Sequence, residues 1–269
     1  MKANPPEKTA RRVAVILGPG GSSRNLLDVI LPLLGRDKAI EMQGVFLEEA
    51  ELKHAAELPF VKELCRVTFS VREFDSDQFD RVLALRMRTA QRALSVLAKR
   101  AGVSHSFRNV RGSAVTLLLE TVNQSDITVF EPVRTMAAAM SSRPYRAQPA
   151  PRILVAINDL ESGTGALIAA SHLAGGEMKR LSVLLAPAAD GDEEALQQVC
   201  RTVLPARPGS VRTMSRFSVD SLVQTVQSLG ASMLVLGASP EFMEPGILRE
   251  LRRRLRCPVC LVRYWGENR

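Results

Sequence analysis

Aromatic residues, cysteines and long apolar runs are all scarce in this sequence of 269 residues. Aromatic side chains make up 4% of it, which argues against single-stranded nucleic acid as a partner, because such ligands stack their bases on exposed rings. Four cysteines are too few and too scattered for a disulfide framework. No stretch approaches the roughly 18 apolar residues that span a bilayer, and the N-terminal residues form no apolar secretion signal. We therefore expect a cytoplasmic protein without a membrane partner.

The remaining composition is that of a globular protein with a positive charge. Hydrophobic residues make up 46% of the chain and charged residues 24%, enough to bury a core. The formal net charge of +8 favours anionic partners in general, although we expect no nucleic acid among them. The length allows two domains of ordinary size.

Two segments begin in the same way, with a short apolar run that ends in turn-forming residues. Residues 12–17 lead into Gly-Pro-Gly-Gly-Ser-Ser at 18–23, and residues 152–157 lead into Asn-Asp-Leu-Glu-Ser-Gly at 158–163. Their apolar residues are continuous rather than alternating, which is typical of strands buried on both faces. A helical pattern follows each turn, so the sequence predicts strand, loop and helix twice.

The alternation of strands and helices continues along both halves. Helices are predicted at 78–101, 114–122, 193–203 and 220–229, with apolar strand segments at 127–130, 181–185 and 233–237. The first half also carries an insertion that we place from Gly44 to Asp80. This alternation predicts βαβ units and a mainly parallel sheet with helices on both faces. We therefore predict an α/β protein of two tandem doubly wound domains, residues 1–145 and 146–269, with a proline-rich linker at 141–151.

The chain resembles the tandem universal stress proteins from Arg12 to Arg263. The resemblance rests on the paired opening strands with their loops, on residues 46–61, and on the closing Cys-Pro-Val-Cys-Leu-Val-Arg at 257–263. It implies the adenine nucleotide alpha hydrolase-like fold in each half. None of the three segments is a catalytic motif, so the resemblance implies a fold and not an enzymatic activity.

ATP-binding members of this family carry the motif Gly-x2-Gly-x9-Gly-Ser/Thr after the fourth strand. Its small residues let the backbone approach the phosphates, and N–H groups at the following helix start bind their charge. In the second half Gly237 occupies the first position, but Pro240 and Glu250 occupy the other two, and Gly246 is the available substitute. Residues 130–133 of the first half contain no glycine. We therefore expect no cofactor, with ATP or AMP not favoured.

The acidic residue that ends the first strand in ATP-binding members is also replaced. Gly18 takes its place in the first half, and Asn158, followed by Asp159, takes it in the second. Asn158 could bind a base or ribose, but we favour a turn residue at a strand-to-helix junction. Gly20 and Ser22 could help to hold an anion, although a serine that caps the next helix is the favoured interpretation. The candidate ligand-pocket residues are Gly18, Gly20, Ser22, Asn158, Asp159, Gly237 and Ser239.

Cys257 and Cys260 have the spacing of a redox pair, but they open a strand rather than a helix. A helix N-terminus normally lowers the thiol pKa in such pairs, so we interpret these cysteines as structural. The other two cysteines and the three histidines show no spacing for metal ligands, so no metal site is expected.

Basic residues concentrate on the last predicted helix. Leucines at helical spacing should face the sheet, and the arginines between them should form a solvated face that could dock an anion. The candidate docking residues are Arg249, Arg252, Arg253 and Arg256.

The sequence therefore predicts a non-enzymatic protein of the universal-stress type that acts through protein contacts or a small regulatory ligand. The alternative is a nucleotide-binding sensor or slow ATPase with an altered loop. Residues 259–262 form an apolar strand for which the first half offers no fifth strand as partner. We therefore expect a homodimer through this open edge. The alternative is internal pairing with residues 127–130 or with a strand hidden in the linker, which gives a monomeric pseudo-dimer.

Overall fold

The computed structural model describes residues 10–19, 23–35, 39–64, 68–132, 152–186, 193–214 and 217–263. The predicted linker at 141–151 lies outside these residues, as do Gly20 and Ser22. In the first half the elements are β1 (Arg11–Leu17), α1 (Ser23–Leu34), β2 (Ile40–Glu49), α2 (Ala50–Ala56), β3 (Lys62–Leu64), β4 (Val71–Glu73), α3 (Ser76–Ala101), β5 (Ser104–Gly112), α4 (Ala114–Gln124) and β6 (Ile127–Phe130). In the second half they are β7 (Ile153–Ile157), α6 (Leu160–Leu173), the 3-10 turn η1 (Met178–Arg180), β8 (Leu181–Leu185), α7 (Glu193–Val203), β9 (Ser210–Thr213), α8 (Val219–Leu229), β10 (Met233–Gly237), α9 (Pro245–Arg254) and β11 (Val259–Val262).

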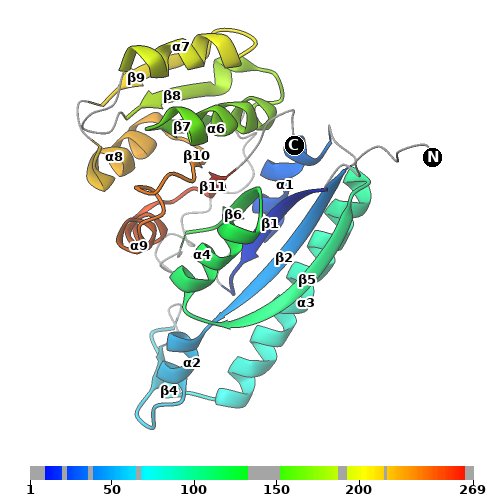
Figure 1. Cartoon of the computed structure of the whole chain (residues 1–269). Helices are drawn as coiled ribbons and strands as arrows, with labels where there is room; N and C mark the ends of the chain where they lie inside the picture. The colour runs from blue at the N-terminus through cyan, green and yellow to red at the C-terminus, as the bar shows by residue number, and fades with distance from the viewer. Residues whose placement is uncertain are drawn as a thin grey trace, which may run out of the picture.

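A single nine-stranded sheet runs through the molecule in the order β5-β2-β1-β6-β11-β10-β7-β8-β9 (Figure 1). From its outer edge inward, each half contributes strands in the order third, second, first, fourth, and the second half adds a fifth strand, β11. All pairs within a half are parallel. The continuous apolar runs at β1 and β7 are buried strands, as the sequence predicted. The α/β class with a mainly parallel sheet is confirmed.

Helices cover both faces of the sheet, so the fold is doubly wound. Helices α1, α3, α6 and α7 pack on one face with Leu26, Leu94, Leu167 and Leu196 among the buried residues. Helices α4, α8 and α9 pack on the other. Side chains of the central strands point alternately to the two faces of the sheet, so each strand contributes to both apolar cores.

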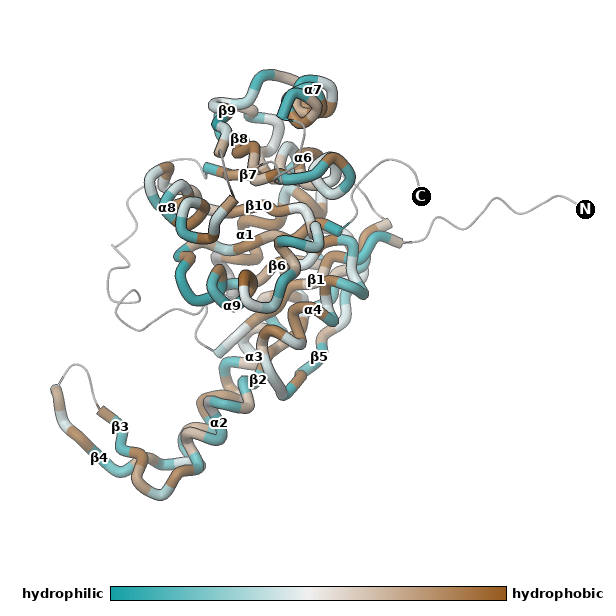
Figure 2. Tube along the Cα trace, turned by 60° about the vertical axis from the view of Figure 1, so that its left-hand side comes forward, coloured by the Kyte–Doolittle hydropathy of each residue, from teal (hydrophilic) through white to brown (hydrophobic). Residues whose placement is uncertain are grey.

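The prediction for the first half places the insertion wrongly and omits one strand. Residues 44–49 do not begin the insertion, because they belong to β2, the second strand of the sheet. The inserted part is shorter and consists of α2 and the β3–β4 hairpin, which projects from the body (Figure 2). The strand β5 at the outer edge of the sheet was not predicted at all.

The open edge expected at β11 does not exist in this chain. Strand β11 pairs in antiparallel register with β6, with Val259 opposite Phe130 and Val262 opposite Ile127. The homodimer argued from that edge therefore loses its basis, and the internal alternative, pairing with residues 127–130, is confirmed. The reason is that β6 is the last strand of its own half, so its outer edge is available to β11.

Antiparallel pairing at this seam reverses the direction of the second half-sheet relative to the first. The carboxyl ends of β1 and β6 consequently lie at one edge of the sheet, and those of β7 and β10 lie at the opposite edge. Each half therefore has its own candidate crevice, and the two crevices lie at opposite ends of the strands.

Candidate functional site

In the second half, the crevice lies where β7 and β10 end side by side. These neighbouring parallel strands lead to opposite sides of the half-sheet, and ligands of open α/β sheets bind at such a switch point. Asn158 follows β7 directly, while Gly237 ends β10 and Ser239 follows in the next loop. Of the candidate ligand-pocket residues, Asn158 lies beside Ser239, while Asp159 and Gly237 both contact or approach Ser162 of α6.

The Asn158 side chain is buried in a small polar network. Its Nδ2 donates to Ser239 Oγ and to Glu241 Oε2, each at 2.9 Å. Because a carboxylate can only accept, the Glu241 contact fixes which end of the amide is the nitrogen. Ser239 Oγ also accepts from the backbone N–H of Phe242 at 3.3 Å. Asn158 is 6% exposed, and its Oδ1 is buried with no hydrogen-bond partner in the described part of the chain.

Asp159 serves the backbone of α6. Its Oδ1 accepts from the Ser162 N–H at 2.8 Å, and its Oδ2 accepts from Ser162 Oγ at 2.5 Å. This is an N-cap, which places a carboxylate on the helix N–H groups that a bound phosphate would otherwise use. The cap at this junction is made by Asp159 and not by Asn158, whose side chain donates to the loop after β10 instead.

Gly237 is required by close packing against the same helix. A Cβ atom added there would lie 2.3 Å from Ser162 Oγ and 2.8 Å from the Ser162 backbone carbon. The first turn of α6 thus lies directly over the end of β10. The sequence analysis aligned Gly237 with the first glycine of the ATP loop and missed this contact. The Asp-x-x-Ser pattern at 159–162 indicates a capped helix start, and it was the sequence feature that could have pointed to α6 at this position.

The loop after β10 carries acidic groups, and the start of α9 that follows it is poorly suited to bind an anion. Glu241 contacts Asn158, and Glu244 is the N-cap of α9 without a capping hydrogen bond from its side chain. Pro245, the first residue of α9, has no N–H to donate. Phe242 anchors the loop, since it is fully buried and its ring meets that of Phe217 edge to face at 4.9 Å.

In the first half, the corresponding crevice is framed by Gly18 and Pro19 after β1 and by Glu131 and Pro132 after β6. Nothing lies within 4 Å of a Cβ added at Gly18. The Arg86 guanidinium of α3 donates to the Pro19 carbonyl oxygen. Gly20 and Ser22 lie outside the described residues, so their predicted roles stay predictions.

Comparison with known proteins gives matches only among solved structures. No family model and no curated protein matches the chain. A universal stress protein from Archaeoglobus fulgidus DSM 4304 is similar over 95% of this chain and 97% of its own, with 12% identity and a TM-score of 0.46. A functionally unknown protein from Pseudomonas aeruginosa PAO1 is similar over 94% of this chain and 92% of its own, with 12% identity and a TM-score of 0.44.

The chain is similar in fold to a universal stress protein. At such low identity the likeness concerns the fold alone. Pro240 and Glu250 replace the second and third glycines of the loop in ATP-binding universal stress proteins. Pro240 lies in the loop after β10, whereas Glu250 lies on α9 and its side chain pairs with Arg253 at 3.0 Å. Gly246 lies in the first turn of α9.

Cys257 and Cys260 face opposite sides of the sheet. Cys260 belongs to the core under α1 and α6, and Cys257 belongs to the core under α8 and α9. Both thiols are free, and burial raises the pKa of each to about 12. This geometry agrees with the structural interpretation and not with a redox pair. No metal-binding cluster of His, Cys, Asp or Glu occurs within the described ranges.

The arginines of α9 mostly have partners within the chain. Arg252 pairs with Glu49 at the end of β2, Arg253 with Glu250, and Arg254 with Asp220 of α8. The Arg252–Glu49 pair is largely shielded from solvent and joins the two halves. Of the predicted docking residues, only Arg249 and Arg256 have no described acidic partner.

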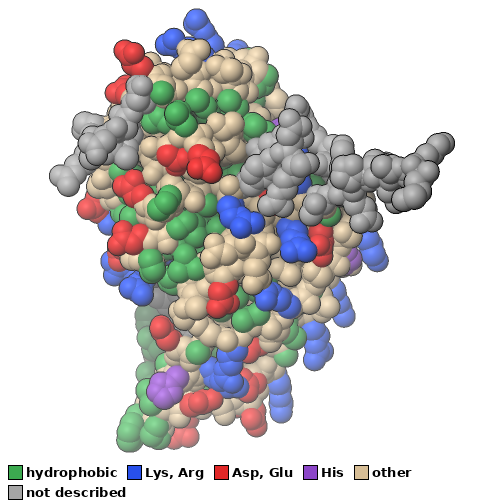
Figure 3. Space-filling view, in the orientation of Figure 1, with side chains coloured by type: hydrophobic (Ala, Val, Ile, Leu, Met, Phe, Trp, Pro, Cys, Tyr) green, Lys and Arg blue, Asp and Glu red, His purple; other side chains and the backbone are tan. Residues whose placement is uncertain are grey.

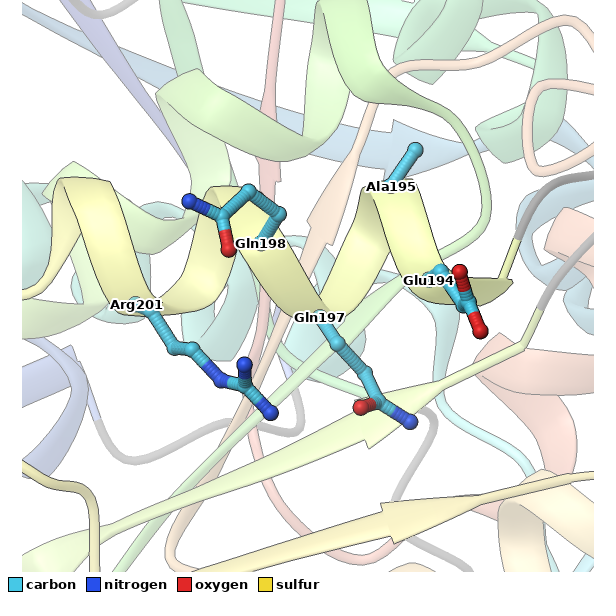
Figure 4. A pocket seen from close by; sticks show the side chains of 5 residues that line it. All are labelled: Glu194, Ala195, Gln197, Gln198 and Arg201. Carbon is cyan, nitrogen blue, oxygen red and sulfur yellow. The ribbon is translucent and has the colours of Figure 1, made fainter.

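Two shallow hollows on the surface lie away from the crevice. One lies along α7 and is lined by Glu194, Ala195, Gln197, Gln198 and Arg201. Figure 4 shows that these side chains leave a single helix in different directions and do not converge on a common point. A second hollow lies between α8 and α9, at Asp220 and Arg254. No helix in the described ranges is long and apolar enough to cross a membrane.

Proposed function

We propose that this chain is a cytoplasmic, non-catalytic protein of the universal-stress type that regulates a stress response through protein contacts, without ATP as a cofactor. The observation that carries the proposal is the polar network in the crevice of the second half. There the Glu241 carboxylate binds Asn158 at 2.9 Å, and the Asp159 carboxylate caps α6. The Asp159 carboxylate accepts from an N–H at the start of α6 that a phosphate could otherwise use, and the Glu241 carboxylate adds a second negative charge to the crevice, so both disfavour an anionic ligand.

The packing of the crevice supports the same proposal. The first turn of α6 contacts Gly237 so closely that the backbone there has no free approach to a phosphate. Pro245 removes one N–H from the start of α9, and Glu244 adds a negative charge at that helix terminus. We find no triad of nucleophile, base and orienting residue among these groups that would support catalysis.

A second candidate function is a sensor of a small polar ligand. It is favoured by Asn158 Oδ1, a buried acceptor with no partner in the described residues. Leaving such an acceptor unpaired is costly, so a ligand with an N–H or O–H donor would gain there. An uncharged donor such as a ribose hydroxyl or an adenine amine suits this site better than a triphosphate, because Glu241 lies beside it.

Isothermal titration with ATP and magnesium tests the proposal. We expect no binding at millimolar nucleotide, for the full chain and for Asn158→Ala alike. Thermal shift with ADP, AMP and cyclic nucleotides extends the test, because a ligand of the native state raises the melting temperature. Asn123→Ala, on the exposed face of α4, is the matched control. A micromolar constant that Asn158→Ala abolishes and Asn123→Ala retains would establish the sensor in place of the proposal.

A further inference from the structure

Helix α3 exposes one full face to solvent along its whole length. It is the longest helix described, with 26 residues, or about 39 Å at 1.5 Å per residue. Asp75 caps its start by accepting from Gln78 N–H at 2.9 Å, and Gly102 ends it with φ of 69°. The inner face packs on the sheet through Ala90, Leu94, Leu97 and Ala98. Among the described elements, none lies over this outer face (Figure 1).

The outer face carries a line of unpaired cations. Arg81, Arg88, Arg92 and Lys99 are all exposed, and at 100° per residue they fall within about 40° of one another around the helix. None forms an ion pair with an acid in the described ranges, whereas three arginines of α9 do. Lys and Arg side chains run down the edge of the molecule on the side of α3 in Figure 3. This face of α3 therefore holds four exposed cations without a described acidic partner, compared with Arg249 and Arg256 among the predicted docking residues.

Apolar side chains form a second line beside these cations. Val82, Leu85 and Val96 are 42%, 63% and 67% exposed, respectively. They lie within about 60° of one another around the helix, next to the line of cations. Single exposed apolar residues need no explanation, but a row of them along one helix face suits an interface.

We propose that this face of α3, with its cationic and apolar lines, docks an acidic amphipathic helix of a protein partner. The proposal rests on the proposed function, in which the chain acts through protein contacts. A partner helix with apolar residues at i, i+3, i+4 and i+7 would cover the apolar line, and glutamates or aspartates beside them would meet the cations. Both features of the face are then used at once.

Other occupants use the face less well. A second copy of the chain would bring two lines of cations together, which like-charge repulsion disfavours. Nucleic acid would pair with the cations but would leave Val82, Leu85 and Val96 against phosphates. A helix that lies on an anionic membrane normally presents bulky Trp, Phe or Leu side chains, and this face offers one leucine and two valines.

The test uses the full chain and two labelled synthetic peptides made only of Leu, Glu and Ala, with identical composition. In one peptide the leucines recur at helical spacing with glutamates beside them; in the other the order is permuted so that no apolar stripe forms. Fluorescence anisotropy should detect binding of the first peptide, with at least tenfold weaker binding of the second.

Matched variants separate the face from general charge. Arg88→Glu with Arg92→Glu should weaken binding at least tenfold. Arg249→Glu on α9 with Arg256→Glu just after it changes the net charge equally at exposed sites without a described acidic partner, and should change binding less than twofold. Leu85→Ala with Val96→Ala should weaken binding at least threefold, an effect that charge alone does not produce. These side chains are exposed, so folding should persist, as circular dichroism will show.

Several outcomes would overturn the proposal. One is an equal loss for the α3 and α9 charge variants, and another is equal binding of the permuted peptide. A third is binding to phosphatidylserine vesicles or duplex DNA that depends on Arg88 and Arg92 when the ordered peptide does not bind. These outcomes are independent of the nucleotide titrations, so the docking face can fail while the proposal of a chain without ATP stands.

Discussion

Gly237 shows how a single residue can be fixed by packing where its sequence context suggests ligand binding. A Cβ atom there would lie 2.3 Å from Ser162 Oγ, and the nearby helix backbone cannot move aside without disturbing the Asp159 cap. We therefore expect Gly237→Ala to lower the free energy of unfolding by about 1–3 kcal/mol, the usual cost of overpacking.

Gly246→Ala is the matched control for this prediction. The nearest atom to a Cβ at Gly246 is Glu244 Oε1 at 3.9 Å, and the residue lies in the first turn of α9. Its substitution should raise stability by up to about 1 kcal/mol, because alanine is the better helix former. Urea denaturation measures both. A Gly237→Ala variant as stable as the parent chain would show that α6 does not press on β10.

The buried thiols of Cys257 and Cys260 give a pH dependence with a definite sign. Burial raises the pKa of both to about 12, whereas an unfolded thiol ionises near about 8.5. Between these values the unfolded state loses protons that the native state keeps, so stability falls as the pH rises. From pH 8 to pH 10 we expect a loss of about 2 kcal/mol for each thiol.

Urea denaturation of the chain and of Cys257→Val with Cys260→Val measures this difference. Cys65 is present in both proteins and cancels. The variant should lose less stability than the chain over the same pH interval. Equal losses in the two proteins would mean that the thiols already ionise in the native state.

Among the elements, the projecting arm of residues 57–64 and 68–74 contrasts with the core. It holds five of the ten exposed large hydrophobic side chains in the described part of the chain, including Phe60 at 89% and Phe69 at 77%. Its two short strands pair only with each other. We expect Phe60→Ser with Phe69→Ser to change the free energy of unfolding by less than about 0.5 kcal/mol.

Phe242→Ala is the comparison for the arm. Phe242 lies in the loop after β10, and its fully buried ring contacts the ring of Phe217. Its truncation should lower the free energy of unfolding by about 3–5 kcal/mol. Chemical denaturation provides both values. A large loss in the arm variant would show that Phe60 and Phe69 are covered in solution.

The elements found from sequence are those whose apolar residues are continuous or recur at helical spacing. The predicted segments at 127–130, 181–185, 193–203 and 233–237 have the bounds of β6, β8, α7 and β10. Strands β5 and β9 were not predicted because most of their residues are polar. Their sequences are Ser-His-Ser-Phe-Arg-Asn-Val-Arg-Gly and Ser-Val-Arg-Thr. Polar sequences suit the two outer edges of a sheet, where an apolar strand would invite aggregation.

Candidate site residues were found in a different way. The resemblance to universal stress proteins made Asn158, Gly237 and Ser239 candidates, since it places them after the first and fourth strands of their half, and β7 and β10 end side by side. The partners of these residues could not be predicted, since the Glu241 contact and the Ser162 packing depend on how α6 and the loop after β10 settle on the sheet. The acidic partners of the α9 arginines could not be predicted for a related reason: ion pairs such as Arg252–Glu49 join residues distant in sequence.

At the scale of the whole molecule, the seam between β6 and β11 makes one sheet from two half-sheets. All four residues of β11 are fully buried, and the two apolar cores continue across the seam. Arg263 N–H donates to the Asp126 carbonyl at 2.9 Å, and Asp126 Oδ2 accepts from Arg12 N–H at 2.8 Å, which ties the end of β11 to β1. We therefore expect the two halves to unfold together.

Leu261→Lys tests this coupling, because Leu261 is fully buried at the seam opposite Thr128. An unpaired charge at that position should cost several kcal/mol and lower the stability of both halves. Hydrogen exchange measured by mass spectrometry should then show faster exchange in β6 and β11 together, and in β1 and β7 as well. Val211→Lys, on the exposed edge strand β9, introduces the same charge at a residue that is 49% exposed and should leave the exchange of all four strands unchanged. If Leu261→Lys accelerates exchange in β11, β10 and β7 while β6 and β1 keep their protection, the halves fold independently and the seam is only a contact between them.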